Sequence, residues 1–138
     1  MTGSPIDTNV IIRFLVETPS SVPVKFKGVF SFFRKVEQEE IIAHVPDLVV
    51  FQSFFVLTSY YEVPASVAAD KLIALISFRG IRMPHKHVML DGLSRVRNHA
   101  DDLVDAWLVA WSKDQKNKGI YSFDTGLKKS GLELLPVE

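Results

Sequence analysis

The feature that most constrains the fold of this chain is a regular alternation of short apolar runs with longer segments of helical period. Ile41 to Val45 and Ile120 to Phe123 are short apolar runs of the kind that form buried strands. Between them, segments such as Pro64 to Phe78 repeat apolar residues at spacings of three and four, which places these residues on one helical face. The alternation predicts βαβ units and therefore an α/β fold with a mainly parallel sheet.

The expected elements follow one another without a linker that would separate domains. The helices are expected at Val10 to Val16 behind a capping start at Thr8-Asn9, Pro23 to Val36, Asp47 to Tyr61, Pro64 to Phe78, His85 to Val96 and Asp101 to Trp111. The strands are expected in a short segment ending at Asp7, at Ile41 to Val45, Arg79 to Met83, Ile120 to Phe123 and Leu132 to Leu135. We therefore expect one domain over residues 1–138.

Composition sets limits on the class of protein. The chain has 138 residues, of which 47% are hydrophobic, and it balances 16 basic against 16 acidic residues. This apolar content is too high for disorder, and the neutral total argues against a non-specific polyanion binder. The sequence has no cysteine, which excludes disulfides, zinc-cysteine sites and thiol catalysis. Neither a secretion signal nor an apolar stretch long enough to cross a bilayer is evident, so we expect a cytoplasmic protein without a membrane partner.

Separated aspartates are the candidates for chemistry. Asp7 and Asp124 each come directly after a short apolar strand. Ligands bind at the carboxyl ends of parallel strands, so these two carboxylates are expected to converge from distant parts of the sequence. The cluster of Asp101, Asp102 and Asp105 opens a helix, and the second and third of these residues share one helical face.

Two interpretations of the aspartate cluster compete. A helix N-terminus favours acidic residues through its dipole, which by itself explains Asp101 and Asp102. Asp105 lies a turn deeper, beside Leu103 and Ala106, where a carboxylate is expected to need a cation. Hard oxygen ligands from two or three carboxylates are typical of Mg²⁺ or Mn²⁺ sites in phosphate chemistry, and we favour this interpretation.

These motifs, in this order, resemble those of the PIN-domain nucleases, a family that includes toxins of bacterial toxin-antitoxin pairs. Ile6-Asp7-Thr8-Asn9-Val10-Ile11 resembles the family's opening motif, and Asp102-Leu103-Val104-Asp105-Ala106 resembles its helical motif. Tyr121-Ser122-Phe123-Asp124 resembles the closing strand. The resemblance spans nearly the whole chain. It implies a PIN-like, three-layer α/β/α domain.

The resemblance also implies a reaction and its residues. Metal-assisted hydrolysis of RNA phosphodiester bonds would use Asp7, Asp105 and Asp124 as ligands of Mg²⁺ or Mn²⁺. Supporting polar residues would be Asn9, Asp102 and Ser122. The second acidic position of the family, normally a glutamate, falls on Gln52, which can ligate through its amide oxygen but brings no charge. A weakened ribonuclease is therefore one expectation, and an inactive PIN-fold binding or scaffold module is the alternative.

A basic tract is the candidate for RNA contact. Its proposed RNA-binding residues are Lys71, Arg79, Arg82, Arg95 and Arg97. Ordinary solvated helix faces explain the same residues equally well. His85 and His87 are expected on the surface, His44 as a satisfied core histidine, and Trp107 with Trp111 in the core.

Partners and a more distant class complete the expectations. Apolar surface is expected from the phenylalanine-rich helices, notably at Phe30, Phe32, Phe33, Phe54 and Phe55. Such a surface predicts a homodimer or a bound antitoxin segment. Another small α/β phosphate enzyme is a further alternative, but the sequence contains no glycine-rich phosphate loop of either standard pattern.

Overall fold

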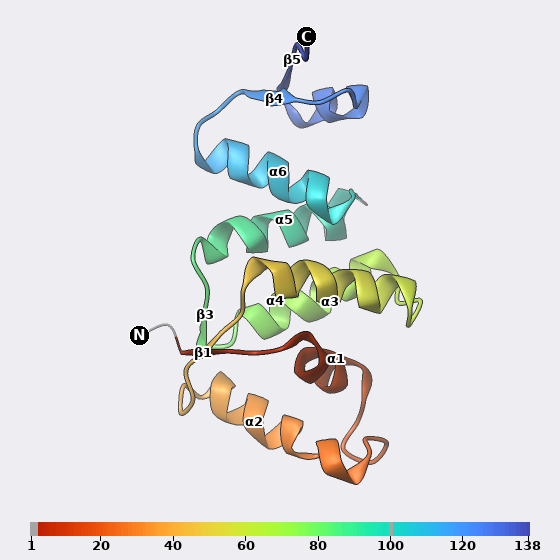
Figure 1. Ribbon diagram of the computed structural model, residues 1–138, viewed down its shortest axis with the longest axis vertical. Coiled ribbons are helices and arrows are strands. Elements are labelled where there is room, and N and C mark those ends of the chain that lie inside the picture. Colours follow the sequence, from red (N-terminus) through yellow and green to blue (C-terminus); the bar gives the residue numbers. More distant parts are fainter. Residues whose placement is uncertain (1–2, 100) are drawn as a thin grey trace.

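The computed structural model describes residues 3–99 and 101–138 and has mixed α/β architecture (Figure 1). Its α-helices are α1 (Thr8–Val16), α2 (Gly28–Glu37), α3 (Asp47–Ser59), α4 (Ala65–Ile76), α5 (Lys86–His99) and α6 (Leu103–Asp114). Its strands are β1 (Ser4–Pro5), β2 (Ala43–His44), β3 (Ile81–Arg82), β4 (Gly119–Tyr121) and β5 (Glu133–Leu135). Two short 3-10 helices, η1 (Val24–Phe26) and η2 (Thr125–Ser130), complete the elements. The expected α/β class and order of elements are confirmed.

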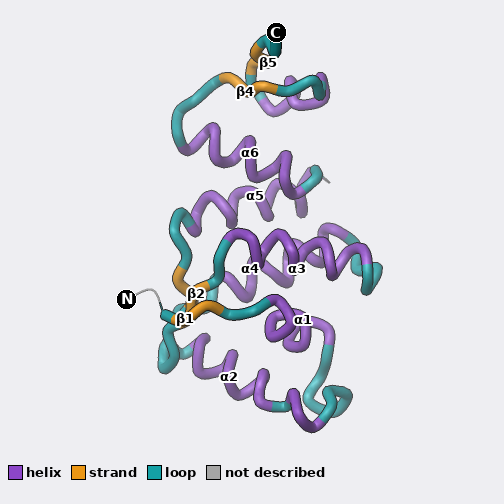
Figure 2. Tube along the Cα trace, in the orientation of Figure 1, coloured by secondary structure: helices purple, strands orange, loops and turns teal. Residues whose placement is uncertain are grey.

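The strands form two parallel sheets instead of the single sheet that the sequence predicts. One sheet has the order β1-β2-β3, with Ser4 opposite Ala43 and Ala43 opposite Ile81. The other pairs β4 with β5, with Ile120 opposite Leu134. Figure 2 shows the two sheets at separate places along the molecule. The expectation of one sheet is therefore wrong, and the three-layer arrangement stays a prediction.

The separation of the sheets follows from how the helices pack. In Figure 1, α1 and α2 lie at one end of the long axis, α3 and α4 follow, and α5, α6 and the β4–β5 sheet continue to the other end. The helix α6 packs on α5, and β4 begins only a few residues after α6 ends at Asp114. Strands of two or three residues make few ladder bonds, so this short connection keeps β4 beside α6 and away from β1.

The main core lies among α1 to α5 and reaches the first half of α6. Phe33, Leu57, Leu72, Leu93 and Leu103 are buried there. At the α5–α6 crossing, Gly92 lies so close to the neighbouring backbone that a Cβ atom would meet Trp107 Cα at 3.2 Å. This close approach fixes α6 against α5 and therefore fixes the position of Asp105, which α6 carries.

A smaller second core supports the C-terminal elements. It contains Val109, Leu127 and Leu132, with Ile120 and Leu134 packed against it. The β4–β5 sheet and η2 are thus attached to the second half of α6. Asp124, which follows β4, is thereby held beside α6 and not beside β1.

The two tryptophans of α6 have different environments. Trp107 packs against the main core and meets Phe51 edge to face at 6.2 Å, as expected for a core residue. Trp111 is 39% exposed, so the expectation that it is buried is wrong. Among the other residues expected in the core, His44 is half-buried and its Nδ1 lies 3.0 Å from the Arg82 carbonyl oxygen, which confirms a satisfied histidine.

Candidate functional site

The largest concentration of carboxylates lines a cavity of about 680 Å³ between α5, α6 and η2. We call it the acidic cavity. Its carboxylates are Asp101, Asp102, Asp105 and Asp124. Its rim also carries positive or titratable groups, which are Arg95, His99, Lys113 and Lys129. The cavity therefore combines the acidic and basic side chains expected at a site for a metal ion and a phosphate.

Two of the aspartates in the acidic cavity, Asp102 and Asp124, are held in place because each caps the start of a helix. Asp102 Oδ1 accepts hydrogen bonds from the backbone N–H groups of Val104 at 2.9 Å and Asp105 at 3.3 Å. Asp124 Oδ1 accepts from the N–H of Gly126 at 2.9 Å at the start of η2. Capping satisfies otherwise unpaired N–H groups and fixes each carboxylate at a helix end. Both residues therefore have a structural role whatever chemistry the cavity performs.

Ser122 acts on the turn that carries Asp124. The backbone N–H of Asp124 donates a hydrogen bond to Ser122 Oγ at 2.9 Å. Ser122 thus positions the backbone of Asp124 and supports its carboxylate indirectly.

Within the acidic cavity, the surroundings of Asp105 shift the pKa of its carboxyl. Burial raises the pKa of the Asp105 carboxyl, and the negative charges of Asp102, Asp124 and Asp101 raise it further. Asp105 caps no helix: its backbone N–H donates to Asp102, and its carboxylate accepts no hydrogen bond from the described residues. Its ionised form is therefore destabilised by the protein, and a bound cation would relieve that cost.

Arg95, on α5, lines the acidic cavity. Its Nε lies 3.4 Å from Asp91 Oδ1, one turn earlier on the same helix. That Nε is buried and, in the part of the chain that the structure describes, has no hydrogen-bond partner of good geometry. The guanidinium group is therefore held at the cavity wall by α5 and by the nearby Asp91 carboxylate.

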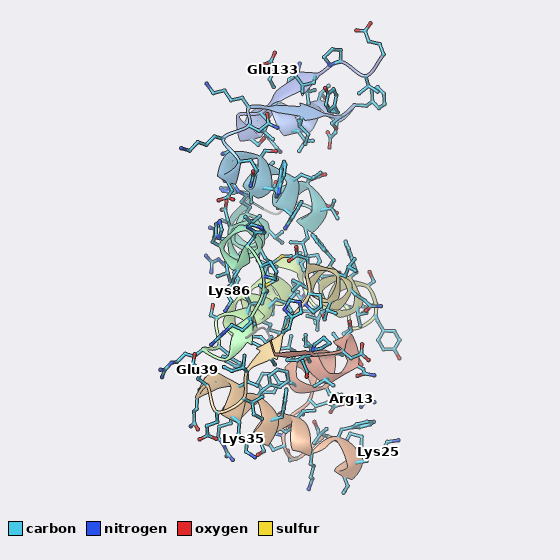
Figure 3. The ribbon with its side chains drawn as sticks, turned by 60° about the vertical axis from the view of Figure 1, so that its left-hand side comes forward. Arg13, Lys25, Lys35, Glu39, Lys86 and Glu133 are labelled. Carbon is cyan, nitrogen blue, oxygen red and sulfur yellow. The ribbon has the colours of Figure 1, made fainter. Side chains whose placement is uncertain are left out.

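A second cavity, of about 460 Å³, lies beside α1 and α3. We call it the Gln52 cavity. Its lining residues are Asp7, Thr8, Asn9, Ile12, Arg13, Gln52, Val56, Tyr60 and Tyr61. Figure 3 labels Arg13 on α1, far along the long axis from Glu133 on β5. The Gln52 cavity therefore belongs to the N-terminal part of the molecule.

Asp7 and Gln52 have local partners in this cavity. Asp7 Oδ1 accepts a hydrogen bond from the Thr8 N–H at 2.8 Å and caps α1, which begins at Thr8, so the capping residue is Asp7 and not Thr8 or Asn9 as expected. Thr8 is buried, and its hydroxyl donates to Gln52 Oε1 at 2.6 Å. The amide oxygen of Gln52, the atom that would ligate a metal, is therefore already used as an acceptor.

The sequence-predicted metal ligands are thus divided between two cavities. Asp105 and Asp124 share the acidic cavity with Asp102, whereas Asp7 lies in the Gln52 cavity with Asn9. Among residues 3–99 and 101–138, no three His, Cys, Asp or Glu side chains are grouped closely enough to hold a metal ion. The structure does not bring Asp7 to the others because β4, which precedes Asp124, is not paired with β1. The expected convergence of all three carboxylates in one cleft is therefore not observed in this structure.

The basic tract is also divided. Arg95 lines the acidic cavity, whereas Arg82, on β3, pairs with Glu39 at 3.1 Å. Arg97 pairs with Asp70 at 3.3 Å. Arg82 on β3 and Arg95 on α5 are separated by the first part of α5, which spans roughly 13 Å at 1.5 Å per residue. The other two members, Lys71 and Arg79, belong to α4 and the turn after it, and Lys71 Nζ donates to the Leu15 carbonyl oxygen at 3.4 Å.

Several residues of these cavities were missed from the sequence. Lys113 and Lys129 complete the basic side of the acidic cavity, and Tyr60 with Tyr61 borders the Gln52 cavity. The two adjacent tyrosines follow the end of α3 at Ser59, whereas the sequence placed both inside the expected helix, so it gave no signal for their exposure. His85 and His87 are exposed as expected, and His87 Nε2 lies 2.7 Å from Asp114 Oδ1.

The comparisons with known proteins add no assignment. No protein-family model matches the chain, and the comparison with curated proteins gives no match. Within the described residues, the helices are all too short or too polar to span a bilayer. The two cavities and the motifs that border them are therefore the basis for inferring a function.

Proposed function

We propose that the chain is a divalent-metal-dependent ribonuclease whose reaction takes place at the acidic cavity. The observation that carries the proposal is Asp105, a carboxylate whose pKa is raised by burial and by Asp102, Asp124 and Asp101. Strongly perturbed titratable groups in a cavity are candidates for functional residues. The PIN-like motifs at Asp7, Asp105 and Asp124 support the same class of reaction.

The chemistry of the donors fits Mg²⁺ or Mn²⁺ at Asp105 and Asp124. Hard divalent cations take carboxylate oxygens, and Mg²⁺ commonly uses only one or two protein carboxylates, with waters and substrate phosphate as its other ligands. Two carboxylates in one cavity are therefore sufficient, although the described residues contain no group of three. Asp7 would join this set only in an arrangement that unites the two sheets.

When bound, such a cation supplies an activated water and neutralises negative charge on the phosphate. The side chains have their own tasks. Asp105 and Asp124 hold the cation, and Asp102 keeps the start of α6 oriented through its cap. Arg95, Lys113 and Lys129 lie where they would contact the phosphates of the RNA backbone.

The test separates charge from capping. Asparagine caps helices about as well as aspartate, so Asp124→Asn retains the cap and removes the charge. We expect Asp105→Asn and Asp124→Asn each to reduce Mn²⁺-dependent cleavage of single-stranded RNA by roughly a hundredfold or more, since even residues that only support a metal ligand cost about 10- to 100-fold. Glu37→Gln, at an exposed position of α2 outside both cavities, is the matched control. Unchanged cleavage in both cavity variants would overturn the proposal.

A second candidate is a non-catalytic RNA-binding or scaffold module. One observation favours it: the amide of Gln52 takes the place of a carboxylate, and its oxygen is already bonded to Thr8. A module of this kind would bind RNA at saturating Mn²⁺ without cleaving it. Binding without cleavage, in a protein that melts cooperatively, would select this candidate over the nuclease.

We propose that the chain binds either a second copy of itself or an antitoxin segment. The PIN-like motifs imply the antitoxin, because the family includes toxins that bind one. Phe33 and Phe54 belong to the buried core, so they do not contribute to such a surface. Phe55 is 41% exposed and Leu48, on the same helix α3, is 80% exposed. Light scattering at high concentration is the test, and a strict monomer would contradict the homodimer. A cytoplasmic location stays a prediction.

A further inference from the structure

The rim of the Gln52 cavity presents two adjacent aromatic rings to solvent. Tyr60 is 77% exposed and Tyr61 is 41% exposed, and their ring centroids are 4.8 Å apart at an interplanar angle of 74°. Both follow the last residue of α3, Ser59. Tyr60 buries little on folding, so packing does not explain its ring, whereas binding would; Tyr61 leaves part of its ring exposed beside it.

The floor of the same cavity carries free hydrogen-bonding groups. Gln52 Oε1 accepts from the Thr8 hydroxyl, which fixes the amide orientation. Its NH₂ group has no hydrogen-bond partner in the described part of the chain and remains available to a ligand. Asp7 uses Oδ1 for its cap, and its second carboxylate oxygen accepts no hydrogen bond from residues 3–99 and 101–138. Donor and acceptor groups therefore face the cavity together.

The charge of the cavity argues against a phosphate as its ligand. Arg13 is its basic lining residue, and it is engaged by Glu17 Oε1 at 3.5 Å and by the Phe26 ring, whose centroid lies 4.0 Å from the guanidinium carbon. The Asp7 carboxylate would repel an anion. A flat, uncharged group that stacks on tyrosine and carries both donors and acceptors on its edge is the better fit, and a nucleobase has these properties.

We infer that the Gln52 cavity binds one unpaired base of RNA, with Tyr60 and Tyr61 as the stacking platform. Asp7, Asn9 and the Gln52 amide then meet the edge of the base. A cavity of about 460 Å³ lies within the usual size range of small-ligand sites. The inference rests on the proposed function, because it takes RNA as the substrate and assigns base recognition to a cavity separate from the carboxylates Asp105 and Asp124.

The experiment measures stacking without cleavage. A single-stranded RNA that contains one 2-aminopurine is titrated with the full chain in EDTA, and base stacking is read as loss of 2-aminopurine fluorescence. We expect Tyr60→Leu and Tyr61→Leu each to weaken binding roughly tenfold, the scale of a lost base–aromatic stack, and the corresponding phenylalanine variants to bind as the wild type does. Tyr121→Leu is the matched control because Tyr121 is 73% exposed on β4, outside this cavity.

Two further ligands sharpen the result. An RNA with an abasic site in place of the 2-aminopurine should lose the contribution of both tyrosines, so that wild type and leucine variants bind it equally. Free 2-aminopurine riboside distinguishes a site for bases in general from one that needs the RNA strand. Binding of the strand alone, or of both ligands, supports the inference as long as it depends on Tyr60 and Tyr61.

The outcomes separate this inference from the proposed reaction. Asp105→Asn should abolish cleavage while leaving quenching intact, because Asp105 lies in the other cavity. Loss of cleavage with intact, tyrosine-dependent quenching supports base binding. An absence of quenching with the wild type, or quenching that the leucine variants leave unchanged, overturns the inference even if the protein cleaves RNA.

Discussion

Gln52→Glu is the substitution that most directly tests the chemistry of the N-terminal cavity. The change is isosteric, and the new carboxylate can still accept the Thr8 hydroxyl that now donates to Gln52 Oε1 at 2.6 Å. It adds a second carboxylate to a cavity that already contains Asp7. We therefore expect the variant to gain affinity for Mn²⁺ that the wild-type cavity lacks.

The magnitudes decide how stable the variant is without metal. A hydrogen bond to a charged group contributes about 1.5 to 3 kcal/mol, against about 0.5 to 1.5 kcal/mol for a neutral one, so the Thr8 bond gains about 1 kcal/mol. Repulsion between Asp7 and the new carboxylate at a solvent-exposed cavity is also about 1 kcal/mol. The two effects nearly cancel, and the metal-free Tm should change by less than about 4 °C.

Metal should then separate the variant from the wild type. With a Kd of about 1 mM, about 10 mM Mn²⁺ adds about 1.4 kcal/mol to the free energy of unfolding by mass action. For a chain of this size that corresponds to an increase in Tm of about 4 to 5 °C. Thermal melts with and without Mn²⁺ measure the difference, and an RNA cleavage assay on the same samples shows whether the new ligand also aids catalysis.

Gln38→Glu is a stringent control for this experiment. It adds the same charge in an exposed turn between Glu37 and Glu39, where carboxylates are dense but neither of the two cavities lies. If Mn²⁺ raises the Tm of the two variants equally, or raises that of Gln52→Glu no more than that of the wild type, then Asp7 and residue 52 do not form a cation site. Either result would refute the expectation that Gln52→Glu creates a cation site.

Three further predictions concern the acidic cavity and its supports. The pKa of the Asp105 carboxyl is raised above its ordinary value of 3.8, so the folded chain binds a proton more tightly than the unfolded chain. The free energy of unfolding therefore falls as pH rises from the ordinary pKa through the raised pKa of the folded chain. Asp105→Asn should therefore be more stable than the wild type at neutral pH without metal, and this difference should disappear below the ordinary pKa. Urea melts at both pH values measure it, and a difference that stays constant with pH would contradict the prediction. Replacing Lys71, Arg79, Arg82, Arg95 or Arg97 with glutamine should weaken RNA binding, and each phosphate that is no longer neutralised should reduce the salt slope by about 0.7; slopes unchanged in all five would identify these residues as solvated surface. Gly92→Val should lower stability by about 1 to 3 kcal/mol, because the new side chain pushes α5 away from α6. Gly28→Val should be tolerated far better, because a Cβ at residue 28 meets nothing within 4 Å. Equal Tm values for the two variants would show that the α5–α6 packing is not tight.

Helices were predictable because their signals are long and redundant. The helix expected from Asp47 to Tyr61 is observed as Asp47–Ser59, and that expected from Pro64 to Phe78 as Ala65–Ile76. In both, a proline marks the start, and many apolar residues agree on one period. Errors of one or two residues at the ends are normal for such boundaries.

The pairing of strands was not predictable for the opposite reason. The strands Ser4–Pro5 and Gly119–Tyr121 contain two and three residues, so their own sequence holds too little information to select a partner. Which strand lies beside which is decided by the packing of α5 and α6, including the close approach at Gly92. The expected convergence of Asp7 with Asp124 depended on that pairing and on nothing local.

The positions of the aspartates are ambiguous in sequence because capping and metal binding favour the same places. Asp7, Asp102 and Asp124 each precede a helix and each accept backbone N–H bonds there, so capping alone accounts for their occurrence. Asp105 is different, since it caps nothing and its charge is opposed by burial and by neighbouring carboxylates. Asp105 lies in the first turn of α6, where the helix dipole favours a carboxylate, so this gain is set against the burial and the neighbouring charges that oppose it. The cation that we propose at Asp105 would offset the burial and the neighbouring negative charges that oppose its ionised form.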